Sequence, residues 1–177
     1  MAKSNTIIKY DISYLILVNN EEKNIKKEIL EILENYKNIL NFQLVVIEDG
    51  STDNTVTILL KLQKEHYFFL STDTKRNGYY KAFKKGIENS KYNTILFSDS
   101  GFKYDSSVFL DYIEYYYKKK IDLYSFYRIN RKDKILRRMM TFFYTLFINI
   151  LFFCRFSDFD SGYKIYNKKK LINILDT

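Results

Sequence analysis

The feature of this sequence that most constrains its fold is a regular alternation of short apolar runs with longer segments of helical periodicity. Apolar runs of strand length occur at residues 12–18, 42–47, 67–71, 94–98 and 122–127. Between them, apolar residues recur every three or four positions, as Ile25, Ile29 and Ile32 do in the first such segment. This order predicts right-handed crossovers and an α/β fold, with a mainly parallel sheet that carries helices on both faces.

The size and composition of the chain favour one cytoplasmic domain. No linker or internal repeat divides the 177 residues, so residues 1–177 are expected to form a single domain. One cysteine, Cys154, excludes an internal disulfide and is typical of a reducing compartment. The N-terminal residues lack the long apolar segment of a secretory signal.

Polar residues follow the predicted strands where each strand ends. They are Asn19, Asn20 and Glu21 after the first strand, Glu48 and Asp49 after the second, Asp99 after the fourth, and Arg128 after the fifth. Ligands of open parallel sheets bind beyond the carboxyl ends of the strands. The sequence therefore predicts a site for a polar ligand at this edge of the sheet.

The positive charge of the chain is concentrated before an apolar segment. The net charge is +8, and six basic residues within eleven positions are opposed only by Asp133. The apolar run 139–154 follows, and its sixteen residues fall short of the roughly 20 that a membrane-spanning helix needs. A basic segment before an apolar helix fits an anionic membrane surface, although a solvated loop and a buried core helix explain the same pattern. No aromatic and basic motif accompanies the charge, so nucleic acid is not an expected partner.

Six segments of the chain, in this order, resemble the motifs of family 2 glycosyltransferases, in particular the polyprenyl-phosphate and dolichyl-phosphate sugar synthases. The segments are "NNEEKNI" (19–25), "IEDGSTDNT" (47–55), "RNGYYKAFKKGI" (76–87), "FSDSGFKYD" (97–105), "YRINRKDKILRRMMTFFY" (127–144) and "SDFDSGYKIYNKK" (157–169). The resemblance implies the GT-A fold, a Rossmann-like fold of nucleotide-diphospho-sugar transferases. Chains of this family normally continue further, so this chain is expected to be short at its C-terminus.

The resemblance implies a site for a nucleotide diphosphate sugar, the donor. Its residues would be Asn20, Glu21, Glu48, Asp49, Gly78 and Asp99. Asp49 would accept a hydrogen bond from a ring N–H of uracil or guanine, and its alternative role is that of a helix cap or turn residue. Glu48 departs from the family pattern, which has an aspartate at this position.

The motif around Asp99 also departs from the family pattern. Where the family has Asp-x-Asp-Gly-Gln, this chain reads Asp99, Ser100, Gly101, Phe102 and Lys103, so the second acid is missing. Asp99 would then hold a divalent cation, Mg²⁺ or Mn²⁺, only weakly or not at all. Lys103 could instead neutralise the leaving diphosphate, because an ammonium group binds phosphate as a point charge.

The resemblance also implies a site for a lipid phosphate, the acceptor. Its residues would be Arg128, Arg131, Arg137 and Thr141, with Arg128 and Arg137 counted among the catalytic residues. Guanidinium groups match phosphate oxygens bidentately, although a solvated role for each arginine remains open. Asp158 would orient groups around the sugar, or act as general base if the acceptor is a hydroxyl.

The expected function is that of an inverting glycosyltransferase of cell-envelope glycan synthesis, peripheral at the inner face of the cytoplasmic membrane. It would move a sugar from the donor to a polyprenyl phosphate, of the dolichyl or undecaprenyl kind. Two alternatives remain open: a polysaccharide or other hydroxyl acceptor, and a catalytically inactive module that binds the donor or docks on a membrane.

Overall fold

The fold comes from a computed structural model, which describes residues 8–101, 105–127, 135–153, 155, 157–158 and 161–175. The strands are β1 (Ile8–Val18), β2 (Ile39–Glu48), β3 (Phe69–Thr72), β4 (Thr94–Asp99), β5 (Leu123–Ser125) and β6 (Tyr163–Asn167). The helices are α1 (Ile25–Tyr36), α2 (Thr55–Glu65), α3 (Tyr79–Asn89), α4 (Val108–Lys119), α5 (Ile135–Leu151) and α6 (Lys168–Leu175).

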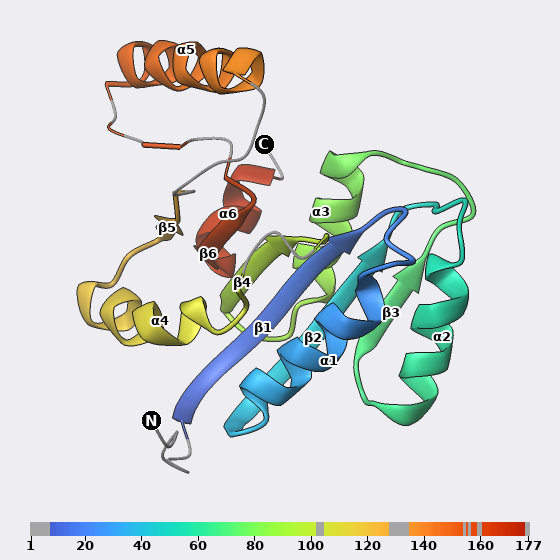
Figure 1. Cartoon of the computed structure of the whole chain (residues 1–177). Helices are drawn as coiled ribbons and strands as arrows, with labels where there is room; N and C mark the ends of the chain where they lie inside the picture. Colours follow the sequence, from blue (N-terminus) through green and yellow to red (C-terminus); the bar gives the residue numbers. More distant parts are fainter. Residues whose placement is uncertain are drawn as a thin grey trace.

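The strands form one six-stranded sheet in the order β3-β2-β1-β4-β6-β5 (Figure 1). The first four strands of the chain run parallel, while β6 runs antiparallel to both β4 and β5. The prediction of an α/β fold with a mainly parallel sheet is thereby confirmed. The crossover helices α1, α2 and α3 allow the parallel pairing, because parallel neighbours need a long connection.

The far end of the sheet differs from the expectation in two ways. Strand β6 was not expected, and it inserts between β4 and the strand expected at residues 122–127, which is reduced to Leu123–Ser125. The pairing of β6 with β4 joins segments more than 60 residues apart, as in Leu96 with Ile165. Local periodicity carries no signal for such a pairing.

Alternating side chains of the central strands build a core on each face of the sheet. On one face, Ile12, Tyr14 and Ile16 of β1 pack with apolar residues of α1, α2 and α4. On the other face, Leu15 and Leu17 pack with α3, and α6 lies partly buried against the same cluster. This two-sided burial holds the carboxyl ends of β1, β2 and β4 in fixed positions.

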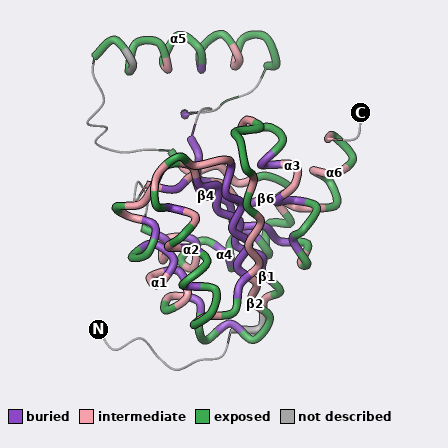
Figure 2. The backbone as a smooth tube through the Cα atoms, turned by 90° about the vertical axis from the view of Figure 1, so that its right-hand side faces the viewer, coloured by how far each residue is buried: buried purple, intermediate pink, exposed green. Residues whose placement is uncertain are grey.

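Helix α5 lies apart from the helices that cover the sheet, and most of its surface is exposed (Figures 1 and 2). The segment expected to be either a core helix or a membrane-facing helix is therefore a helix with an exposed apolar surface. Within the described residues, no helix combines the length and apolarity needed to cross a membrane.

Candidate functional site

The loops that follow β1 and β2 are joined by a set of hydrogen bonds. The backbone N–H of Asn20 donates to Ser51 Oγ at 2.8 Å, and Asn20 Oδ1 accepts from the backbone N–H of Thr52 at 2.8 Å. The backbone N–H of Glu21 donates to Thr55 Oγ1 at 2.8 Å. Asn20, expected to bind the donor, thus holds the two loops together with its side chain.

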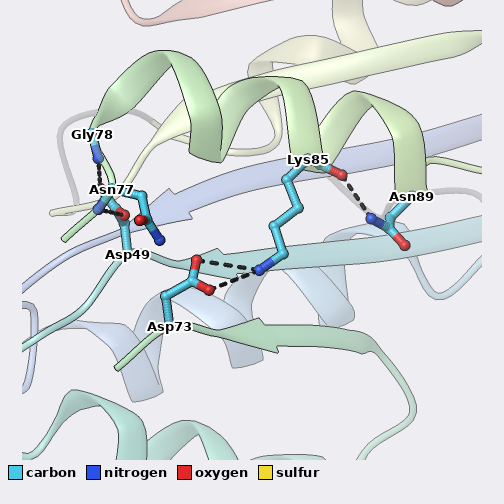
Figure 3. A network of polar contacts seen from close by, with 6 residues as sticks. All are labelled: Asp49, Asp73, Asn77, Gly78, Lys85 and Asn89. Carbon is cyan, nitrogen blue, oxygen red and sulfur yellow. Dashed lines mark hydrogen bonds and ion pairs between the residues drawn. The ribbon is translucent and has the colours of Figure 1, made fainter. Parts of the chain in front are cut away.

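Asp49 fixes the start of α3 with both of its carboxylate oxygens (Figure 3). Its Oδ1 accepts from the backbone N–H of Asn77 at 2.7 Å, and its Oδ2 accepts from that of Gly78 at 3.0 Å. The side chain is only 5% exposed. Asp49 therefore holds the turn before α3, as its alternative role requires. Its contact with a base stays a prediction.

The loop between β2 and α2 also depends on Glu48 and Gly50. Glu48 is fully buried, and its Oε1 accepts from the backbone N–H of Ser51. Among the described residues its Oε2 has no hydrogen-bond partner. Gly50 has φ +65°, and a Cβ there would overlap the backbone of Lys75 and Arg76. The second loop therefore packs directly against the segment that leads into α3.

Asp99 is held at the end of β4 by its neighbours in space. Its backbone N–H donates to the Gly162 carbonyl at 3.1 Å, and the N–H of Ser100 donates to the Leu17 carbonyl at 3.1 Å. A Cβ on Gly162 would overlap Asp99 Oδ2, so a larger residue there would displace this carboxylate from its observed position. Burial, with a smaller contribution from the Asp99 charge, raises the pKa of Tyr166 above its usual value.

These elements enclose a cavity of about 250 Å³ at the carboxyl ends of the strands. It is lined by Leu17, Val18, Asn19, Glu21, Asp49, Arg76, Tyr79, Ala82, Asp99 and Ser100. Three of the expected donor residues, Glu21, Asp49 and Asp99, therefore meet in one cavity. The other three do not line it: Asn20 and Gly78 lie in the supporting loops, and Glu48 is the last residue of β2.

Two lining residues, Arg76 and Tyr79, were not expected from the sequence. Within the described part of the chain, Arg76 is the one basic side chain that lines this cavity, which it shares with three carboxylates. Its backbone position is fixed on one side by the approach of Gly50 and on the other by the bonds from Asp49 to Asn77 and Gly78. The signal was present in the sequence, since both residues lie within the matching segment 76–87.

Two of the residues expected around the acceptor, Asp158 and Thr141, line two other cavities. Asp158, which is 6% exposed, lines a cavity of about 220 Å³ with Tyr127, Arg155 and Ser157 among its neighbours. Thr141 lines a cavity of about 270 Å³ that also includes Ser157. Neither residue lines the cavity of Asp99, but Ser157 lines both of their cavities.

Several expected residues cannot be placed in these cavities. Lys103, Arg128 and Arg131 lie outside the described residues. Arg137 lies on α5, where the structure describes its backbone but not its side chain. Their roles stay predictions.

The carboxylates near Asp99 do not form a closed metal site in the described part of the chain. No three histidine, cysteine or acidic residues come together there in a way that could hold a metal ion. Gly101, at the position of the missing second acid, has φ +103°, a conformation that favours glycine. A divalent ion at Asp99 would therefore depend on other oxygens, such as those of a bound diphosphate.

Comparison with known proteins places the chain among glycosyltransferases. It is 37% identical over 86 residues, 45% of the chain and 25% of the relative, to a dolichyl N-acetyl-α-D-glucosaminyl phosphate 3-β-D-2,3-diacetamido-2,3-dideoxy-β-D-glucuronosyltransferase of Methanococcus voltae. It is 27% identical over 147 residues, 79% of the chain and 34% of the relative, to the poly-β-1,6-N-acetyl-D-glucosamine synthase of Staphylococcus epidermidis. The chain thus spans only about a third or less of the curated relatives it matches, with matched shares from 15% to 34%.

The fold also matches solved glycosyltransferase structures. A crystal structure of glucosyl-3-phosphoglycerate synthase from Mycobacterium tuberculosis in complex with UDP aligns with a TM-score of 0.68 and 19% identity, over 90% of this chain and 57% of that one. The α/β sheet described above is therefore the expected GT-A fold. The sequence profile of the family described as "Glycosyl transferase family 2" matches residues 13–175, nearly the whole chain. This chain belongs to glycosyl transferase family 2.

Proposed function

We propose that this chain transfers a sugar, with inversion, from a nucleotide diphosphate sugar to a polyprenyl phosphate at a membrane surface. The observation that carries the acceptor part of this proposal is the apolar outer surface of α5. The donor part is supported by the cavity of Asp49, Arg76 and Asp99, and by the mycobacterial neighbour, whose crystal structure contains UDP.

The donor cavity has the groups that a nucleotide diphosphate requires. Asp49 already accepts two backbone hydrogen bonds, but a carboxylate has about four lone-pair sites and can accept another from a base. The Arg76 guanidinium, on the same cavity, can pair with diphosphate oxygens. Asp99 lines this cavity as well, where its carboxylate can accept hydrogen bonds from sugar hydroxyls or hold a divalent ion that contacts the diphosphate.

Transfer to a phosphate needs little help from a base. A phosphate oxygen of the acceptor attacks the anomeric carbon, the bond from that carbon to the diphosphate oxygen breaks, and the diphosphate leaves with the electron pair. Arg76 would stabilise the charge that develops on the diphosphate. A divalent ion, when bound through Asp99, would neutralise the same charge.

The two sides of α5 differ in polarity, which supports a lipid surface as the place of this reaction. The side that faces the cavity is mixed: it carries Thr141, Thr145 and Asn149 beside the apolar Phe142 and Leu146, and Thr145 is 7% exposed. The opposite side exposes Met140, Phe143 and other large apolar residues. Exposed to water, these side chains contribute no hydrophobic stabilisation. Their burial in lipid would be favourable by about 25 cal/mol per Å² of apolar surface.

Charge complementarity favours an anionic lipid surface over another protein. Six basic residues lie at positions 128–138, directly before and within the first turn of α5. A basic run next to an apolar helix binds anionic membranes by two additive contributions. The name of the Methanococcus relative, which refers to a dolichyl-linked substrate, agrees with a lipid acceptor for that protein.

A hydroxyl acceptor is the second candidate function, and one observation favours it. Asp158 is nearly buried and lines a cavity with Ser157, where it could take a proton from a sugar hydroxyl. The staphylococcal relative is named as a synthase of a polysaccharide.

A labelled-sugar assay separates these possibilities. The full chain, with vesicles that contain undecaprenyl phosphate, is supplied with radiolabelled UDP- and GDP-sugars in turn. We expect label to enter the organic phase with the parent and with Asp105→Asn, a control in the connection that follows β4. Asp99→Asn should lose most of this transfer.

The other outcomes decide against the proposal in different ways. Label that enters only a water-soluble polymer supports the hydroxyl acceptor. An absence of transfer, together with an absence of UDP or GDP binding by calorimetry, supports a docking module without donor binding.

A further inference from the structure

Helix α1 carries a buried carboxylate on the side that packs against the sheet. Glu28 is 8% exposed and lies among Ile25, Ile29 and Ile32, which are fully or almost fully buried. A carboxylate in such a place is costly to bury unless it is hydrogen-bonded. Its position in the first turn of α1 is favourable for a negative charge, because the helix dipole is positive at that end.

The Glu28 carboxylate reaches the turn that follows Asp99. Its Oε2 accepts a hydrogen bond from the backbone N–H of Gly101 at 3.0 Å. Gly101 has φ +103°, so the chain turns sharply two residues after Asp99. The contact therefore connects the start of α1 with the end of β4, across 73 residues of sequence.

Three consecutive N–H groups of this turn are held by three separate elements. The N–H of Asp99 donates to Gly162, that of Ser100 to Leu17, and that of Gly101 to Glu28. The first two acceptors are backbone carbonyls, which almost any sequence would provide. The third acceptor is the side chain of Glu28. Of the three hydrogen bonds, only this one would be lost on replacing the acceptor residue by an apolar one.

We propose that Glu28 is a positioning residue for the transfer reaction, which fixes the turn 99–101 and so keeps the Asp99 carboxylate in place at the donor cavity. The inference rests on the proposed function, because it assigns Asp99 a role in that reaction. With Gly101 where the family pattern has its second acid, Asp99 is the remaining carboxylate of that motif. Its placement depends on the two backbone anchors at Gly162 and Leu17 and, through Gly101, on the anchor that Glu28 supplies.

Stability alone does not account for a carboxylate at this position. Replacing buried charged groups by well-packed apolar residues is often neutral or stabilising, and leucine would match the apolar neighbours of Glu28 on α1. The hydrogen bond is instead directed to the backbone of the turn that carries Asp99.

The direct test of the anchor is amide hydrogen exchange at Gly101, measured by NMR on the full chain. Glu28→Leu removes the acceptor, so we expect the Gly101 amide to exchange at least about tenfold faster than in the parent, since an unanchored amide opens locally. Glu28→Gln keeps an acceptor oxygen and should stay within about threefold of the parent. Equal Gly101 exchange in the parent and Glu28→Leu would overturn the proposal.

A matched control comes from the same helix. Tyr36 donates its hydroxyl to the Ser106 carbonyl at 2.7 Å, so Tyr36→Phe removes another buried bond between α1 and the connection after β4. This variant should lower the melting temperature without faster exchange at Gly101. Faster Gly101 exchange in Tyr36→Phe as well would mean that any weakening of α1 loosens the turn, against a specific role of Glu28.

The link to the reaction is tested by a double-mutant cycle in the labelled-sugar assay. Glu28→Leu should lower kcat by about tenfold to a hundredfold, the effect of misplacing a reacting group by an ångström or less, with little change in the donor KM. In an Asp99→Asn background it should have almost no further effect. Full additivity of the two changes would contradict an action through Asp99. A parent that transfers no sugar would contradict the proposed function, while the exchange measurement still decides whether Glu28 holds the turn.

Discussion

At the scale of single residues, the proposed transfer depends on Asp99 and on the glycine that makes room for it. Gly162 lies so close that a Cβ would overlap Asp99 Oδ2, whereas a Cβ on Gly86 would overlap only the Leu15 side chain in the core. Substituting Gly162 therefore tests the position of Asp99, whereas substituting Gly86 tests the packing of the core.

We predict that Gly162→Ala displaces the Asp99 carboxylate and lowers transfer by at least about tenfold, which is about 1.4 kcal/mol of transition-state stabilisation. Gly86→Ala, the control, should destabilise the fold by about 1 to 3 kcal/mol, as overpacking does, with little loss of kcat in the folded fraction. Urea unfolding and initial rates measure the two effects. Unchanged activity in Gly162→Ala would show that Asp99 is not needed in its observed position.

Asp49 is expected to bind the nucleotide and is seen to hold the start of α3, and one substitution affects both. We predict that Asp49→Asn weakens nucleotide diphosphate binding by about 1.5 to 3 kcal/mol, the usual range for a hydrogen bond to a charged group. It also loses one acceptor for the backbone at Asn77 and Gly78, so the start of α3 should become less stable. Calorimetry with UDP and GDP measures the affinity.

The control for this variant is also visible in Figure 3. Asp73 forms an ion pair at 3.0 Å with Lys85, a residue of the same helix α3. Neither residue lines the cavity. Asp73→Asn should leave nucleotide affinity unchanged and cost at most about 1 kcal/mol of stability, because the pair is partly exposed. An affinity equal to that of the parent in Asp49→Asn would remove Asp49 from the donor site.

The missing second acid gives a prediction about metal ions. We expect the parent to transfer sugar in the presence of a chelator, with Arg76 or Lys103 as the cation for the leaving diphosphate. Gly101→Asp should not restore a metal site on its own, because a residue with a side chain at φ +103° is strained by about 1 to 3 kcal/mol. A parent that is inactive with chelator and recovers with Mg²⁺ or Mn²⁺ would show that Asp99 finds further ligands.

At the scale of elements, α5 is the part whose surface least suits water. Phe143 and Phe147 are exposed on its outer side, and the basic run precedes it in sequence. The membrane account requires both features, and each can be changed separately.

We predict that the parent sediments with anionic vesicles and dissociates as salt rises, since the charge attraction is screened within a Debye length of about 10 Å at 0.1 M salt. Replacing Arg131, Lys132 and Lys134 by Gln should weaken binding at low salt. Phe143→Ser with Phe147→Ser should weaken it at all salt concentrations, because full burial of one such side chain contributes about 1.5 to 3 kcal/mol.

The control for the vesicle experiment lies on another part of the surface. Leu60 and Tyr67 are exposed apolar residues in and just after α2, a helix far from α5 (Figure 1). Leu60→Ser with Tyr67→Ser should bind vesicles as the parent does. Equal sedimentation of the α5 variant and the parent would mean that α5 does not contact lipid.

Some strands, helices and site residues were predictable from the sequence, and others were not. The alternation of strands and helices was predictable because each strand and its crossover helix are local in sequence, and the strand-end rule correctly brought Glu21, Asp49 and Asp99 together. Strand β6 was missed because its pairing with β4 is distant in sequence and its five residues carry little periodicity. Arg76 and Tyr79 were missed because they lie just before and at the start of α3 and do not directly follow a strand.

At the scale of the whole molecule, the proposed donor site lies at the carboxyl edge of the sheet. The hydrogen bonds between the loops after β1 and β2, the bonds from Asp49 to the start of α3, and the anchored turn after β4 all fix backbone around one cavity. Such a preorganised site can hold charged groups with little rearrangement on binding.

The most direct test of the central claim is a crystal structure of the chain soaked with UDP or GDP. The account predicts the base beside Asp49, the diphosphate in contact with Arg76, and its terminal phosphate toward Asp99. A nucleotide bound elsewhere on the surface, with the cavity of Asp49, Arg76 and Asp99 unchanged, would contradict the account.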